Sequence, residues 1–144
     1  MFSSRQLSDL HPVLQEQCRQ FIEACAEHGI EVIITSTYRD NEAQAALYSQ
    51  GRSRPGPKVT NARPGTSAHN YGLAFDFCPI VNGKADWQNI DTFHQCGSIA
   101  ESLGLEWAGR WGYFAELAHC QNLLGVSLNE WRDKPAKAIS HAPS

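Results

Sequence analysis

A carboxylate inside an apolar strand is the first feature of this sequence that could carry out chemistry. Asp76 stands between Phe75 and Phe77, in a segment from residue 72 to 78 whose side chains alternate between two faces. An ionised group in such surroundings is costly unless a cation meets it. The pattern therefore predicts a cationic partner for Asp76. Arg39 would satisfy it as an ion pair, but the spacing of nearby histidines favours a metal ion.

Two histidines are candidates to share that metal ion with Asp76. His69 lies seven residues earlier, in a turn that leads into the strand, and His119 lies far along the chain. Two imidazoles and one carboxylate leave a fourth position open, as a catalytic zinc site requires. Taken singly, His69 could be a surface histidine and His119 a buried structural one.

Glu116 is the candidate general base, because it precedes His119 by three residues. Zinc lowers the pKa of a bound water to about 7, and a nearby carboxylate can take the proton and return it to a leaving amine. In a continuous strand Glu116 and His119 would face opposite sides. The prediction therefore requires a turn at Leu117 and Ala118 or one helical turn, and the spacing leaves both open.

The segment 51–66 is predicted to be a long loop, because glycine and proline interrupt it six times. It also holds Arg52, Arg54, Lys58 and Arg63, a third of the twelve basic residues of an otherwise acidic chain. These charges either belong to a solvated loop or grip carboxylates of a substrate. We expect Arg52, Arg54 and Lys58 to contact substrate.

The elements that must position these residues follow from the hydrophobic pattern. Apolar residues at three-to-four spacing predict a helix from about residue 10 to 25 and another over 91–103, and a shorter helix is expected over 42–50. Strands are expected over 30–36, 72–78 and 119–123, with a tight turn at 81–84. The fold class predicted is α+β: a small antiparallel sheet with helices packed on one face and a zinc site on the other.

Composition excludes several classes of protein. A chain of 144 residues with 42% hydrophobic residues fits one domain with a core. A net charge of -3 disfavours nucleic-acid binding and nuclease activity, and no apolar run is long enough to suggest stable membrane insertion or a signal peptide. The five cysteines form no C-x-x-C pair, so we expect free thiols that pack as small apolar side chains.

Residues 67–76, SAHNYGLAFD, match a motif that resembles a known family. The motif, S-x-H-x-x-G-x-A-x-D, is that of zinc peptidases that include D-alanyl-D-alanine carboxypeptidases and the L-alanyl-D-glutamate endopeptidases of bacteriophage endolysins and bacterial cell-wall hydrolases. Thr37-Tyr38-Arg39 with Gln44 is similar to an upstream block of that family, and 104–119 to its closing block. The resemblance spans roughly residues 6 to 122.

The resemblance implies a role for each matching residue. His69, Asp76 and His119 would bind one Zn²⁺, and Glu116 would be the general base. Arg39 would stabilise the oxyanion of the tetrahedral intermediate or hold a substrate carboxylate, work suited to a planar cation. Ser67 and Trp111, which fall in the matching blocks, are also expected to contact substrate.

The function expected from this resemblance is cleavage of peptidoglycan stem peptides. The leading prediction is a phage endolysin that cuts the L-alanyl-D-glutamate bond, made in the host cytoplasm without a signal peptide and acting as a monomer on the cell wall. The alternatives are a D-alanyl-D-alanine carboxypeptidase or dipeptidase, and a non-catalytic cell-wall-binding module stabilised by zinc. We expect the peptidase domain to span residues 1–127 and a polar C-terminal tail to span 128–144.

Overall fold

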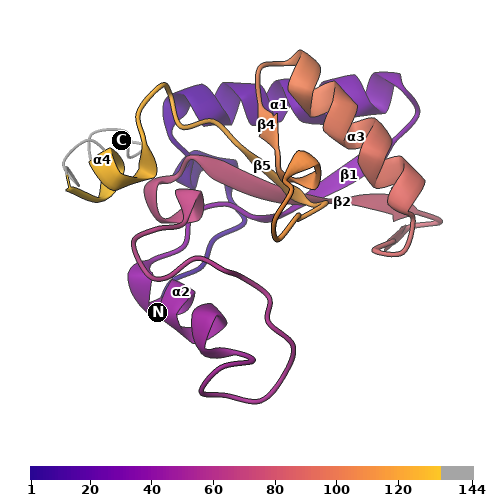
Figure 1. The fold of residues 1–144 in the computed structure, drawn as a ribbon. Helices are drawn as coiled ribbons and strands as arrows, with labels where there is room; N and C mark the ends of the chain where they lie inside the picture. The colour runs from indigo at the N-terminus through magenta and orange to yellow at the C-terminus, as the bar shows by residue number, and fades with distance from the viewer. Residues whose placement is uncertain (134–144) are drawn as a thin grey trace.

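An antiparallel sheet forms the centre of the fold in the computed structural model, which describes residues 1–133 (Figure 1). Its strands lie in the order β1-β2-β5-β4, and β3 pairs with β2 in a hairpin. The strands are β1 (Glu31–Ser36), β2 (Ala74–Val81), β3 (Lys84–Ala85), β4 (Glu106–Trp107) and β5 (His119–Gln121). The predicted strands and the turn at 81–84 are thus present, and β1 to β5 pair with one another antiparallel.

Two long helices cover one face of this sheet. They are α1 (Pro12–Glu27) and α3 (Ile90–Ser102), which lie along the same side in Figure 1. Phe21 of α1 packs against Phe75 and Phe77 of β2, with ring centroids 5.4 and 4.9 Å apart, and Phe93 of α3 lies 5.4 Å from Phe77. The expected α+β arrangement is confirmed. Within residues 1–133, no helix combines the length and apolarity needed to cross a membrane.

The cysteines belong to this core. All five are free thiols and all are buried, and Cys18 and Cys25 lie on the buried stripe of α1. Burial raises the pKa of Cys18 to about 12, which makes its thiolate rare at neutral pH. The expectation that the cysteines pack as small apolar side chains is confirmed.

Helix α2 (Asn41–Ser49) and the loop after it lie on the opposite side of the sheet from α1 and α3 (Figure 1). Helix α2 is capped by Asp40, whose side chain accepts a hydrogen bond from the amide of Ala43 at 2.7 Å. The segment 51–66 follows without a helix or a strand, as predicted. In Figure 1, α2 and this loop project together from the side of the sheet that α1 and α3 leave uncovered.

Part of the expected polar tail, residues 128–133, lies within the described structure. These residues form a short helix, α4 (Leu128–Asp133), and Trp131 on it is buried. The Trp131 indole donates a hydrogen bond to the carbonyl of Leu123 at 3.1 Å, and its ring lies 6.1 Å from that of Tyr71. A single large aromatic residue therefore ties this polar segment to the domain, and the remainder of the tail lies outside the described residues.

Candidate metal centre and active site

The three predicted metal ligands meet on the open face of the sheet. The Oδ1 atom of Asp76 lies 3.2 Å from Nε2 of His69 and 3.1 Å from Nδ1 of His119. One donor atom from each residue lies within 4.8 Å of the other two. Residues that are 50 positions apart in the sequence thus direct their donor atoms at one point.

Strand register places two of these ligands. Asp76 and His119 are directly opposite each other in the pairing of β2 with β5. Side chains of directly opposed residues lie on the same face of an antiparallel pair. Because Phe75 and Phe77 point to the helices, Asp76 and His119 point to the other face.

A short helical turn places His69. It is a 3₁₀ helix, η2 (Ala68–Tyr71), that begins with a capping box: the Ser67 hydroxyl accepts from the amide of His69, and the Asn70 side chain accepts from the amide of Ser67. Gly72 ends the turn at φ 69°, a conformation that suits glycine, and the chain enters β2. Ser67 therefore caps the turn that carries His69.

The hydrogen-bond partners of His69 show why a cation fits here. Its Nδ1 lies 2.6 Å from the carbonyl oxygen of Thr37, which can only accept, so Nδ1 carries the proton in the neutral ring. Burial lowers the pKa of His69, although Asp76 partly opposes this, so the ring is neutral near pH 7. Its Nε2 lone pair then faces a carboxylate oxygen. Two acceptors 3.2 Å apart repel each other unless a cation lies between them.

The charges of the other two ligands also suit a cation. Burial opposes ionisation of Asp76, but His69 and His119 outweigh it and hold the pKa of Asp76 well below its usual range. Burial likewise opposes the charged form of His119, but Asp76 and Glu116 raise its pKa overall. The site thus holds an ionised carboxylate at the point where the donor atoms converge. The donor set, two imidazoles and one carboxylate, is one that zinc accepts.

Arg39 lies beside the candidate metal ligands rather than replacing a metal ion. Its Nη2 is 3.9 Å from Oδ2 of Asp76, while Oδ1 of Asp76 faces the two histidines. The guanidinium is held by the side chains of Gln44, at 2.7 Å, and Ser36, at 3.1 Å. Burial lowers the pKa of Arg39. One oxygen of Asp76 therefore faces Arg39, and the other is left to face the two histidines and the candidate metal position.

Glu116 enters the same cavity because the chain turns before β5. Leu117 and Ala118 form a turn in which the amide of His119 donates to the carbonyl of Glu116 at 3.3 Å. The indole of Trp107 donates to the carbonyl of Leu117 at 2.8 Å and so fixes this turn. Of the two alternatives for bringing Glu116 and His119 together, the structure has the turn. Burial raises the pKa of Glu116, with Asp76 adding to the effect.

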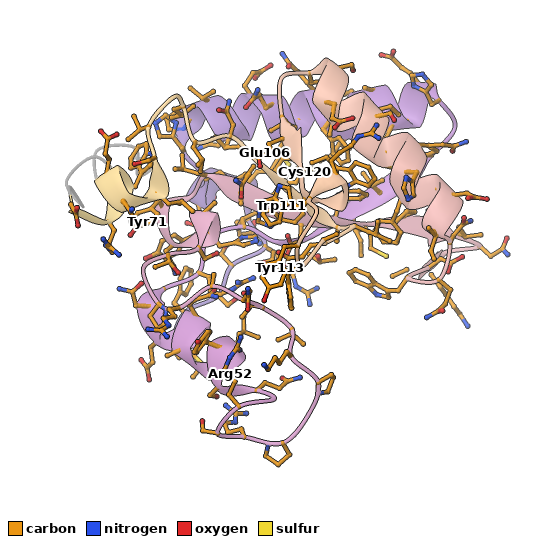
Figure 2. The ribbon with its side chains drawn as sticks, viewed as in Figure 1. Arg52, Tyr71, Glu106, Trp111, Tyr113 and Cys120 are labelled. Carbon is orange, nitrogen blue, oxygen red and sulfur yellow. The ribbon has the colours of Figure 1, made fainter. Side chains whose placement is uncertain are left out.

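A cavity of about 590 Å³ opens over these residues. It is lined by Arg39, the three candidate metal ligands and Glu116. One wall comes from the loop, through residues 59–62 and 66–68, and includes Ser67. The other wall carries Trp111, Tyr113 and Phe114. Figure 2 shows Trp111 and Tyr113 at the centre of the molecule, above the loop that carries Arg52.

The basic residues of the loop are not brought into the cavity. Arg52, Arg54 and Lys58 are absent from its walls, as far as residues 1–133 define them. Arg52 instead donates to the carbonyl oxygens of Tyr48 and Thr60, and its guanidinium stacks on the Tyr48 ring at 3.8 Å. It thereby braces the loop, while Arg54 and Lys58 stay exposed.

The sequence predicted no role for four residues around the site. Gln44 connects Arg39 to the loop, since its Nε2 donates to Thr60 and to the carbonyl of Ala62. Tyr113 is an exposed aromatic on the cavity wall. Gln121 contacts His119, and Glu106 contacts Gln121. The position of Gln121, two residues after His119 in a strand, could have predicted its contact with His119, because residues two apart lie on the same face.

Comparison with known proteins finds relatives that are named as peptidoglycan peptidases. The chain is 39% identical over 129 residues to the peptidoglycan L-alanyl-D-glutamate endopeptidase CwlK of Bacillus subtilis, covering 79% of this chain and 74% of that one. It is 28% identical over 149 residues to the L-alanyl-D-glutamate peptidase of Listeria phage A118, covering 99% of this chain and 50% of that one.

The fold is also found among solved structures. A mutant of the vancomycin-resistance D,D-pentapeptidase VanY, in complex with Zn(II), superposes with a TM-score of 0.61 at 16% identity, covering 92% of this chain and 83% of that one.

Residues 7–131 match the VanY family of D-alanyl-D-alanine carboxypeptidases. The match includes the candidate metal ligands and extends into α4. The chain therefore belongs to the VanY family of D-alanyl-D-alanine carboxypeptidases.

Proposed function

We propose that this chain is a zinc-dependent peptidase that cleaves the L-alanyl-D-glutamate bond of peptidoglycan stem peptides. The observation that carries the proposal is the convergence of His69, Asp76 and His119 in one cavity with Glu116 and Arg39. The names of the relatives from Bacillus subtilis and Listeria phage A118 support this choice of bond.

The roles of the residues follow from their chemistry. His69, Asp76 and His119 would hold the zinc, which when bound lowers the pKa of a water and polarises the scissile carbonyl. Glu116 accepts a proton from the attacking water and delivers it to the leaving amine, and its raised pKa suits both halves of this transfer. Arg39 stabilises the negative charge that develops on the former carbonyl oxygen, because its guanidinium is already held in place by Gln44 and Ser36.

We propose separate roles for the remaining predicted substrate-binding residues. Ser67 and Trp111 lie in the cavity walls and would contact the stem peptide directly. Arg52 would shape the wall by bracing the loop. Arg54 and Lys58 would act at longer range, by attracting the carboxylate-rich peptide toward the cavity.

Mass analysis of digested cell wall tests the choice of bond. The zinc-loaded protein is incubated with purified peptidoglycan, and Glu116→Gln serves as the inactive control. Fragments with new L-alanine C-termini are expected. Release of free D-alanine would favour the D-alanyl-D-alanine carboxypeptidase alternative. Binding to the wall without any cleavage would favour the non-catalytic module.

A role in lysis by a bacteriophage accompanies this proposal. It is supported by the similarity to the Listeria phage peptidase over 99% of this chain. In that role the protein would act on the cell wall of the host. A turbidity assay on permeabilised Gram-negative cells tests it, and an unchanged turbidity with active, zinc-loaded protein would count against lysis of these hosts.

A further inference from the structure

A chain of hydrogen bonds connects the candidate metal ligand His119 to the wall of the cavity. Nε2 of His119 lies 2.7 Å from Oε1 of Gln121. Nε2 of Gln121 donates to Oε1 of Glu106 at 3.2 Å, and the Trp111 indole donates to Oε2 of the same carboxylate at 2.8 Å. Figure 2 shows Glu106 and Trp111 next to each other at the centre of the view.

Strand pairing builds this chain into the sheet. Gln121 is two residues beyond His119 on β5, so the two side chains share a face. Glu106 on β4 is the direct register partner of Gln121. Gln121 is buried, whereas Glu106 is exposed. A carboxylate at the edge of the sheet is therefore connected to the metal centre through one buried amide.

The carboxylate determines the orientation of that amide. A carboxylate accepts hydrogen bonds and donates none, so Gln121 must turn its NH₂ group toward Glu106. Its carbonyl oxygen must then face His119, where it can only accept. His119 is consequently protonated on Nε2 in its neutral form, and the Nδ1 lone pair is directed at Asp76 and the candidate metal position.

The same carboxylate also holds the substrate wall. Trp111 lines the cavity and its ring centroid lies 5.6 Å from that of His119. Its indole N–H is bound to the oxygen of Glu106 that Gln121 leaves free. Each oxygen of Glu106 thus has one partner, one leading to the metal ligand and the other to the wall.

We propose that Glu106 is a positioning residue that fixes the tautomer of His119 through Gln121 and, through Trp111, couples zinc binding to the substrate wall. The proposal rests on the proposed zinc site but is independent of which peptide bond is cut. Groups that orient a metal-bound histidine in this way typically contribute 10-fold to 100-fold to metal affinity.

Zinc affinity of the metal-free protein, measured by competition with a chelator, tests the first part. Glu106→Gln removes the obligatory acceptor, so the Gln121 amide is free to reverse, and we expect zinc affinity to fall about 10-fold to 100-fold. Glu31→Gln is the matched control, because Glu31 is an exposed glutamate on β1 of the same sheet. Unchanged affinity in Glu106→Gln, with folding verified by circular dichroism, would overturn the proposal.

A reciprocal exchange separates positioning from a general structural effect. In the double variant Glu106→Gln/Gln121→Glu, the carboxylate stands next to His119 and accepts directly from Nε2, while the amide now at 106 donates to it and still accepts from Trp111. We expect this exchange to restore most of the zinc affinity that Glu106→Gln loses. A double variant that binds zinc no better than Glu106→Gln would contradict control of the tautomer.

Trp111→Phe tests the coupling to the wall. It keeps an aromatic ring but removes the indole donor, so we expect zinc affinity to fall about 2-fold to 10-fold and KM for a stem peptide to rise. Trp87→Phe is the control, since Trp87 is exposed and lies outside the cavity lining. Because Trp111 acts on zinc through Glu106, combining Trp111→Phe with Glu106→Gln should cost no further zinc affinity. If the fold-losses in zinc affinity of the two single variants instead multiply in the double variant, the coupling through Glu106 is overturned.

The positioning role of Glu106 and the proposed peptidase activity can be refuted independently of each other. A parent protein that binds one zinc ion with the expected dependence on Glu106, yet cleaves no stem peptide, would refute the peptidase and leave the positioning role intact. A parent protein that cleaves stem peptides while Glu106→Gln binds zinc normally would refute the positioning role alone.

Discussion

Asp76 and His119 lie directly opposite each other on β2 and β5, and Oδ1 of Asp76 is 3.1 Å from Nδ1 of His119. The register of two strands thus decides whether the candidate metal centre can form. A slip of one residue in this pairing would turn one of the two side chains to the helix-covered face. The aromatic residues on either side of Asp76 prevent such a slip, because Phe75 and Phe77 are fully buried beneath α1.

Replacement of Glu116 should separate catalysis from metal binding. We expect Glu116→Gln to lower kcat by about 100-fold to 10,000-fold, the range for loss of a general base, while zinc binding is retained. The check is a turnover assay on a stem peptide together with metal analysis of the same preparation. Loss of zinc in the variant would mean that Glu116 supports the metal centre and is not simply a base.

The fall in activity at low pH should follow the protonation of Glu116. Burial raises the pKa of this carboxyl above its ordinary value of 4.5. A general base works only when deprotonated, so kcat/KM should fall as the pH drops through that raised pKa, and the acid limb should lie above pH 4.5. Zinc content is measured at each pH to exclude metal loss. An acid limb that persists unchanged in the residual activity of Glu116→Gln at full zinc occupancy would argue against Glu116 as the base.

Removal of zinc should destabilise the sheet more than the helices. A ligand that binds only the folded state contributes about 4 kcal/mol at a concentration 1,000 times its Kd, so chelation should lower Tm by several degrees. Without zinc, the facing acceptors of His69 and Asp76 repel each other. Hydrogen exchange should therefore quicken in β2 and β5 before α1. Identical melting curves with and without chelator would show that zinc adds nothing to folding.

Gly97 should resist a substitution that normally stabilises a helix. It lies within α3, where alanine is favoured over glycine by about 1 kcal/mol, but an added Cβ would stand 2.2 Å from the Trp107 ring. We expect Gly97→Ala to lower the free energy of unfolding by about 1–3 kcal/mol, the usual cost of overpacking. Activity should fall as well, because Trp107 holds the turn before His119. Gly112→Ala, which meets no atom within 4 Å, is the control.

Arg54 and Lys58 should affect the rate of substrate capture rather than its chemistry. They are exposed and outside the cavity walls, so we expect the double variant Arg54→Ala/Lys58→Ala to lower kcat/KM at low salt and to match the parent at high salt, where exposed charges are screened. Steady-state kinetics at two ionic strengths are the check. Arg52→Ala should instead lower Tm, because Arg52 braces the loop.

The sequence by itself determined the elements and the reactive residues. Alternation along 72–78 separated Asp76 from Phe75 and Phe77, and this local period predicted both the strand and an isolated carboxylate that needs a cation. The motif around His69 identified the family before any contact was known. These features are local, because they depend on neighbours within a few positions of the chain.

Only the tertiary structure decided how these residues combine. Arg39 faces Oδ2 of Asp76, whereas both histidines face Oδ1. The loop 51–66 contributes polar and apolar residues to the cavity wall, and its basic residues Arg52, Arg54 and Lys58 lie outside that wall. The connection from His119 through Gln121 to Glu106 depends on the pairing of β4 with β5. Such contacts join residues far apart in sequence, and their existence depends on strand register and side-chain packing, which no local pattern encodes.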